Sequence, residues 1–264
     1  MHVKGCCLLR SLAAGLLVAA LSGCPVRAPP PAAQPAVPTA PPPAAAEQPA
    51  PHVGKPYDIV PQESLLTILV FRAGTLANAG HNHVIAAHAL SGTIYVPREL
   101  SGVSFEVQVP LAALTVDEAS LRAAQMSPDF PPQVPETARE GTRRNMLGGA
   151  LLNAADYPQI ILRALTVAPA AEGAGAHGVA AAEAPAGVVQ VRLQAEVRAA
   201  QRTLSVPVHY ERSDSTVIAA GELPLRQTSL GLTPFSALLG ALQVQDEMQV
   251  KFRIVARAAG SLAR

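Results

Sequence analysis

The sequence predicts an all-β domain of antiparallel strands, closed as a barrel or packed as a sandwich, with one or two short helices. In residues 188–198 one face is apolar and the other polar, the period-two pattern of a strand with one buried face. The same alternation recurs in 203–210, 103–109 and 248–254. No βαβ rhythm is present, so a parallel sheet is not expected. One-sided antiparallel strands must hide their apolar faces, and a barrel or a sandwich does so while limiting exposed edges.

The remaining elements are weaker versions of the same patterns. Apolar, β-branched runs predict further strands, which are expected at 65–71, 84–95 (with a break at Ser91-Gly92), 159–167 and 216–227. The short connection 199–202 indicates a hairpin between two of the alternating strands. Helices are expected only at 118–125 and 136–147, the second rich in charge, and the Ala/Gly-rich stretch 168–187 reads as a long exposed loop.

The first 23 residues have the features of an export signal. Lys4 and Arg10 give a positive start, and the apolar stretch 8–21 is shorter than the roughly 20 residues that a membrane-spanning helix needs. The stretch ends in Leu21-Ser22-Gly23-Cys24, which resembles the lipobox of bacterial lipoproteins. We therefore expect cleavage before Cys24 and acylation of that cysteine. The alternatives are an ordinary signal peptide with a chance cysteine, or a retained anchor.

Residues 24–56 are expected to form a linker, because Pro and Ala dominate and large apolar side chains are nearly absent. Such a segment is typically extended and serves as a spacer, with a docking site for a proline-recognising partner as the alternative. The folded domain is then expected at 57–258, with 259–264 as a tail. Acylated Cys24 would hold the domain at the bacterial cell envelope, facing the periplasm. Pro25, in place of the Asp that commonly retains lipoproteins in the inner membrane, favours the outer membrane.

Composition excludes several classes of function. The formal net charge is +1 and no basic run stands out, so nucleic-acid binding is not expected. The cysteines lie at positions 6, 7 and 24, so the expected domain has no disulfide, no thiolate metal site and no cysteine nucleophile. The acidic pairs Asp117-Glu118 and Asp246-Glu247 are interpreted as solvated caps. No Gly-x-Ser-x-Gly elbow is present. We therefore assign no catalytic residue and expect no required cofactor.

Several segments, in the right order over nearly the whole domain, resemble the YceI-like family. They are the opening segment 57–64, the turn 91–94, the segment 144–146 followed by 153–160 with its Tyr-Pro-x-Ile, and the late motif 226–232. The chain also departs from the family: Leu230 stands where an aromatic residue is usual, and Ala199-Ala200-Gln201 replaces a Gly-Val-Thr hairpin. The stretches 79–83 and 234–240 are not typical of the family's best-known members. The resemblance therefore indicates a divergent member.

The resemblance implies an antiparallel lipocalin-like β-barrel with an elongated apolar interior, which in some members holds a polyisoprenoid chain. Alternation alone does not separate a packed core from a ligand tunnel. If a tunnel exists, the inward positions expected to line it are Val191, Leu193, Leu204, Val206, Val250 and Phe252. Arg144 and Arg226 are candidates for binding a ligand head group at the barrel mouth, with structural salt bridges as the alternative. Nothing in the pattern specifies a protein partner or an oligomeric state.

One cluster of histidines suggests metal chemistry. His81 and His83 would share a face of a strand and could both approach one metal, whereas His88 has the wrong spacing and His209 falls on a polar face. The alternative is a polar barrel rim in which His83 bonds to backbone. Three hypotheses follow: a non-enzymatic barrel that binds a lipid or isoprenoid, a metal- or redox-associated module using His81 and His83, and an envelope lipoprotein with a structural or stress-related role and no ligand.

Overall fold

A computed structural model describes residues 47–170 and 185–259 of the chain. The expected signal peptide, Cys24, most of the linker, the centre of the 168–187 loop and the last five residues lie outside these ranges. Within the ranges that the structure covers, no helix is long and apolar enough to cross a membrane.

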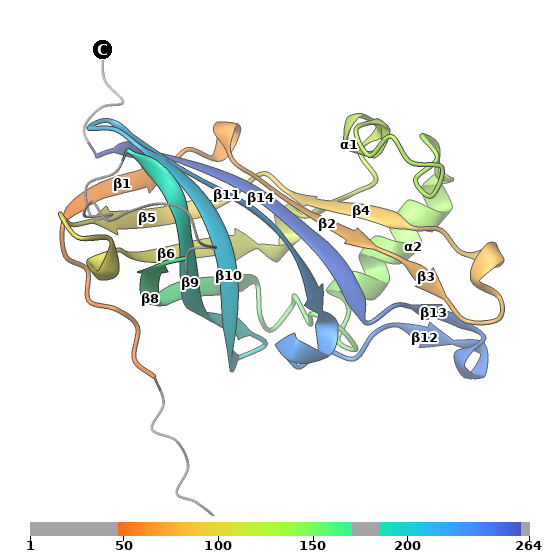
Figure 1. The fold of residues 1–264 in the computed structure, drawn as a ribbon. Helices are drawn as coiled ribbons and strands as arrows, with labels where there is room; N and C mark the ends of the chain where they lie inside the picture. Colours follow the sequence, from red (N-terminus) through yellow and green to blue (C-terminus); the bar gives the residue numbers. More distant parts are fainter. Residues whose placement is uncertain (1–46, 171–184, 260–264) are drawn as a thin grey trace, which may run out of the picture. The chain divides into compact units, whose positions relative to one another are not determined.

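Antiparallel strands form a closed ring, so the expected all-β fold is confirmed as a barrel rather than a sandwich (Figure 1). In the described residues the ring has eight strands, which are, in spatial order, β1 (Lys55–Ile59), β5 (Ser91–Val96), β6 (Ser104–Pro110), β8 (Gln159–Pro169), β9 (Ala186–Val197), β10 (Ala200–Arg212), β11 (Thr216–Arg226) and β14 (Glu247–Ala258). The ring closes because β1 pairs with β5 on one side and with β14 on the other.

One edge of the long strand β14 pairs with two strands. Its C-terminal part pairs with β1, and its middle part pairs with β2 (Leu65–Val70). A 3-10 turn, η1 (Pro61–Glu63), bends the chain between them. The Ser64 hydroxyl fixes this bend: its oxygen accepts a hydrogen bond from the Val255 amide (3.0 Å) and donates one to the Val255 carbonyl (3.3 Å). From β2 the sheet continues to β4 (His83–Ala87) and β7 (Thr115–Val116).

Two helices and a small second sheet complete the described structure. Helix α1 (Ala119–Ala123) follows β7, and helix α2 (Glu136–Leu147) lies beside the β4 end of the sheet (Figure 1). A three-stranded sheet of β12 (Ser236–Ala237), β13 (Leu242–Val244) and β3 (Arg72–Ala73) extends from that same end. Single 3-10 turns form the connections η2 (Ala77–Ala79), η3 (Leu100–Gly102), η4 (Leu111–Ala113), η5 (Gln227–Leu230) and η6 (Leu238–Gly240).

The structure differs from the sequence-based expectation in three details. The segment 84–95 is two strands rather than one interrupted strand, because β4 pairs with β2 and β7 whereas β5 pairs with β1 and β6. The hairpin between β9 and β10 is tighter than expected: its two-residue turn places Arg198 (φ 51°) and Ala199 (φ 60°) in the left-handed region. Strand β1 begins at Lys55, two residues before the expected domain boundary.

The core lies inside the ring and is built from the inward side chains of the alternating strands. In β9, for example, Val189, Val191 and Val197 are all buried. The same buried cluster includes Leu111, Leu152 and Met146 from the connections and α2, so it continues to the end of the barrel. Packing and sheet hydrogen bonds therefore stabilise the described domain, as its lack of cysteine requires.

Candidate functional site

The barrel encloses an apolar cavity of about 560 Å³. Its wall includes the six side chains expected from the alternation: Val191, Leu193, Leu204, Val206, Val250 and Phe252. Strand register explains why they meet. Val191 lies directly opposite Val206, and Leu193 opposite Leu204, across β9 and β10. Phe252 lies opposite Gly221 on β11, and a Cβ at Gly221 would come within 2.7 Å of the Phe252 ring. Gly221 therefore leaves room for the ring of Phe252 on β14.

The size of the inward side chains explains why the interior is not filled. An eight-stranded barrel is wide enough for its side chains to fill it or for one small ligand. Here many inward positions are Val or Ala, such as Val189, Ala195 and Ala219, and the chain contains no Trp. These short side chains leave space along the axis, and the volume lies within the range of small-molecule sites.

Two expected head-group residues are not part of the cavity wall. Arg144 lies on the outer face of α2, where its side chain is 73% exposed and 3.8 Å from Glu140. Arg226 ends β11 on the exposed face, because the inward positions of that strand are Leu223 and Leu225. Neither arginine therefore lines the cavity, and a role for the two at the barrel mouth stays a prediction. Helical and strand periodicity place both side chains toward solvent.

The polar side chains that do line the cavity come from other positions. Arg72, His81, His83, Thr142 and Asn145 line it near the α2 end, and Arg212 lines it on the last residue of β10. The remaining polar lining residues are Tyr210, Gln227 and Gln243. No Asp or Glu is among the described residues that line it. Cationic and neutral polar groups thus interrupt an otherwise apolar wall.

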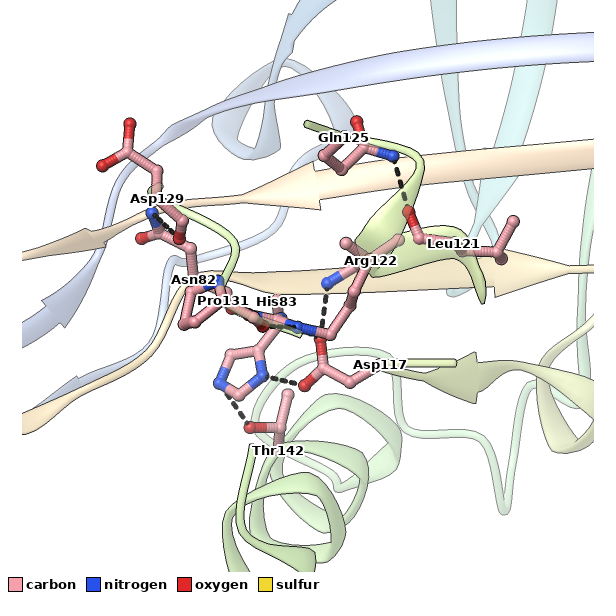
Figure 2. Close-up of polar contacts among 10 residues, drawn as sticks. Asn82, His83, Asp117, Leu121, Arg122, Gln125, Asp129, Pro131 and Thr142 are labelled. Atoms are coloured by element: carbon pink, nitrogen blue, oxygen red, sulfur yellow. Dashed lines mark hydrogen bonds and ion pairs between the residues drawn. The ribbon is translucent and has the colours of Figure 1, made fainter. Parts of the chain in front are cut away.

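His83 is held in a buried chain of hydrogen bonds, shown in Figure 2. Its Nδ1 lies 2.6 Å from Asp117 Oδ2, and its Nε2 lies 3.0 Å from the hydroxyl of Thr142 on α2. A carboxylate can only accept, so Nδ1 carries the hydrogen, and in the neutral ring Nε2 accepts from the Thr142 hydroxyl. These hydrogen bonds therefore connect strand β4 to helix α2 at the end of the barrel.

Asp117 is the centre of this network. It is 3% exposed, and its Oδ1 accepts from the Val84 amide (2.9 Å) and from the Arg122 guanidinium (2.5 Å). Burial raises the pKa of Asp117, but the hydrogen bonds from His83, Val84 and Arg122 outweigh this effect and hold the pKa below its usual value. The expectation that Asp117 is a solvated cap is wrong, because this carboxylate is the buried counter-ion of Arg122.

Arg122 is itself buried, at 1% exposure. It donates to the carbonyls of Asn82 (2.8 Å) and Pro131 (2.7 Å), and its guanidinium carbon lies 5.7 Å from the ring centre of Phe130. These contacts join the segment after α1 to β4. Arg122 is not part of any sequence motif. Its spacing of five residues from Asp117 matches neither the helical nor the strand period, so the sequence did not indicate their contact.

His81 and His83 share a face, as expected, with ring centres 6.1 Å apart. Burial lowers the pKa of His81, and the neighbouring His83 and Arg122 lower it further, so the ring is favoured as neutral. Both nitrogens of His83 are already bonded, which leaves none for a metal. No group of three or more His, Cys, Asp or Glu side chains that could hold a metal ion occurs in the described ranges. His88 instead bonds Glu118 on the exposed surface (2.8 Å).

Comparison with known proteins gives matches among solved structures. No family model and no curated protein matches the chain. BcnA from Burkholderia cenocepacia is 16% identical, with a TM-score of 0.49 over 75% of this chain and 99% of that one. A polyisoprenoid binding domain from Saccharophagus degradans, described as implicated in plant cell wall breakdown, is 12% identical, with a TM-score of 0.48 over 76% and 98%. The YCEI protein of Campylobacter jejuni is 6% identical, with a TM-score of 0.42 over 66% and 83%.

Proposed function

We propose that this protein is a non-enzymatic lipid carrier, a divergent YceI-like barrel that holds an apolar guest such as a polyisoprenoid. The observation that carries the proposal is the cavity of about 560 Å³ enclosed by aliphatic side chains. Each methylene that leaves water for such an interior contributes about 0.8 kcal/mol. Affinity for a homologous series of chains should therefore rise with chain length until the cavity is full.

The polar residues of the wall give the guest an orientation. Arg72 is positively charged, and His81 is neutral with no hydrogen bond to a described residue, so both can bond an oxygen-bearing group. No carboxylate lines the cavity in the described part of the chain. A guest with a polar end should place it here, with its chain along the aliphatic wall.

We further propose that the barrel is tethered by acyl chains on Cys24 at the envelope of a bacterium, facing the periplasm. Support comes from the sequence: the lipobox-like Leu21–Cys24 and the Pro/Ala-rich spacer that follows it. A single acyl chain gives only marginal binding to a bilayer, whereas several chains on one residue hold a protein firmly. Labelling with a fatty-acid probe tests the anchor: the label should be lost in Cys24→Ala, and a persistent label would refute it.

A matched pair of substitutions tests the cavity as the binding site. Ala219 on β11 lines the cavity, and the next residue, Ala220, points to the outer face. Ala219→Phe should fill the space and sharply reduce the lipid extracted from purified protein, whereas Ala220→Phe should leave it at the wild-type level. Equal lipid content in both variants, with the fold retained by circular dichroism, would show that the guest lies elsewhere.

A further inference from the structure

The small sheet at the α2 end presents an unusual surface. We define the apolar tip as residues 74–80 and 235–242, which form the turns beside β3, β12 and β13 at the right of Figure 1. The sequence has no Asp, Glu, Lys or Arg from residue 73 to 97, nor from 227 to 245. Both chain segments that build the tip are therefore free of formal charge, in contrast to β14, which carries Lys251, Arg253 and Arg257.

Leucines stand at the outermost turn of the tip. Leu239 is 110% exposed, Leu238 is 67% exposed, and Leu76 on the neighbouring turn is 46% exposed. Single exposed leucines are ordinary on protein surfaces, but three on adjoining turns without charge form an apolar patch. A patch of this kind marks a binding surface.

The backbone conformation of Leu238 and Leu239 is also unusual for leucine. Leu238 (φ 52°) and Leu239 (φ 56°) both adopt the left-handed conformation, which Asn and Gly accept most readily. A turn that served only to connect β12 and β13 would gain stability from those residues. The strain and the exposure of Leu238 and Leu239 thus act in the same unfavourable direction, which points to a function of the two side chains.

The tip is a defined unit. The Leu76 amide donates to the Ala241 carbonyl (2.8 Å), and Gly74 lies so close that a Cβ there would be 2.3 Å from the same oxygen. The tip also adjoins the cavity, because Gly80, Phe235 and Leu242 line the cavity wall. The exposed leucines therefore lie next to the end of the cavity at which Arg72 and His81 are part of the wall.

The dimensions and charge of the tip favour a bilayer over a protein as its partner. A stable protein interface covers about 800 Å² per partner and 20–30 residues, far more than two short turns provide. A bilayer needs no complementary partner surface, and an uncharged apolar tip enters its interface without desolvating charges. We propose that the apolar tip inserts into a lipid bilayer through Leu238, Leu239 and Leu76, so that the adjoining end of the cavity faces the acyl chains. This proposal does not rest on the identity of the cargo.

The absence of Trp from the chain permits a direct test with the full-length protein. Leu239→Trp places a single indole at the tip. Val53→Trp places one at a position that is 56% exposed, beside the β1 end of the barrel. Each protein is mixed with phosphatidylcholine vesicles that carry brominated acyl chains, and indole emission is recorded. Attachment through the N-terminus is the same in both variants, so a difference in quenching between them reports on the tip.

Strong quenching and a blue shift in Leu239→Trp, with little change in Val53→Trp, are the expected result. Equal quenching of the two variants, or none in Leu239→Trp, would overturn the proposal. A blue shift of Leu239→Trp that appears without vesicles and grows with protein concentration would also overturn it, in favour of a second copy of the chain as partner.

A second variant separates insertion from folding. In a Leu76→Trp chain, the added changes Leu238→Asn and Leu239→Gly suit the left-handed turn and should keep or raise the urea midpoint. The vesicle concentration for half-maximal quenching should rise about tenfold or more for each leucine removed. An unchanged concentration would show that the leucines do not enter the bilayer.

Discussion

The buried carboxylate of Asp117 provides the sharpest test of how the barrel end is held together. Asp117→Asn keeps the shape of the side chain and an oxygen for the Val84 amide, and Asn tolerates the left-handed backbone at this position (φ 57°). The substitution removes the charge that balances Arg122, whose side chain is 1% exposed. An uncompensated buried charge costs about 3–5 kcal/mol.

This loss is large against the roughly 5–15 kcal/mol by which a domain is stable. With a urea dependence of about 2 kcal/mol per molar, the unfolding midpoint should fall by roughly 2 M. The matched control is Glu63→Gln, which breaks a surface pair with Arg257 whose side chains are 43% and 41% exposed. The control should cost under about 1 kcal/mol.

The double variant Asp117→Asn/Arg122→Met tests the cause. It removes both charges and should be more stable than Asp117→Asn alone, since an apolar side chain replaces the orphaned guanidinium. If Asp117→Asn and Glu63→Gln lowered the midpoint equally, or if the double variant were the least stable, the assignment of Asp117 as the essential counter-ion of Arg122 would be refuted.

Three further outcomes follow from the same geometry. The pKa of Asp117 is lower in the folded state than in the unfolded state. The carboxylate therefore stabilises the fold above the unfolded pKa, and this stabilisation is lost as pH falls through the folded pKa. Acid unfolding followed by circular dichroism should be less steep in Asp117→Asn. Thr142→Val keeps the shape but removes the hydrogen bond to His83, so urea unfolding should show a loss of about 1 kcal/mol, and no loss would argue against the link to α2. Gly92→Ala should destabilise by more than about 2 kcal/mol in the same assay, since φ is 134° and the Cβ would lie 2.0 Å from the Glu106 carbonyl oxygen; a wild-type midpoint would contradict that close approach.

Period-two alternation was sufficient to predict the strands and their inward faces, because burial of one face imposes that period directly. Val191 and Leu193 illustrate this: each lies inside, and each faces a partner from the next strand that the same alternation predicts. The division of 84–95 into β4 and β5 was not predictable in the same way. Which neighbour a strand pairs with depends on the closure of the whole ring, and no local pattern reports it.

The polar end of the site was only partly predictable. The shared face of His81 and His83 follows from their spacing, but the partners of His83 come from segments 34 and 59 residues away in the chain. Long-range polar contacts of this kind have no periodicity. Arg144 and Arg226 lie in segments that resemble family motifs, whereas Arg72, which lines the cavity, lies outside every such segment.

The central claim, that the closed barrel holds an apolar guest, is tested most directly by mass. The protein is purified without detergent from a bacterial host, and its mass is measured under native and under denaturing conditions. We expect a native mass that exceeds the denatured mass by that of one lipid, with the excess absent in Ala219→Phe. Identical native and denatured masses in the wild-type protein, from every host and growth condition tried, would contradict the claim.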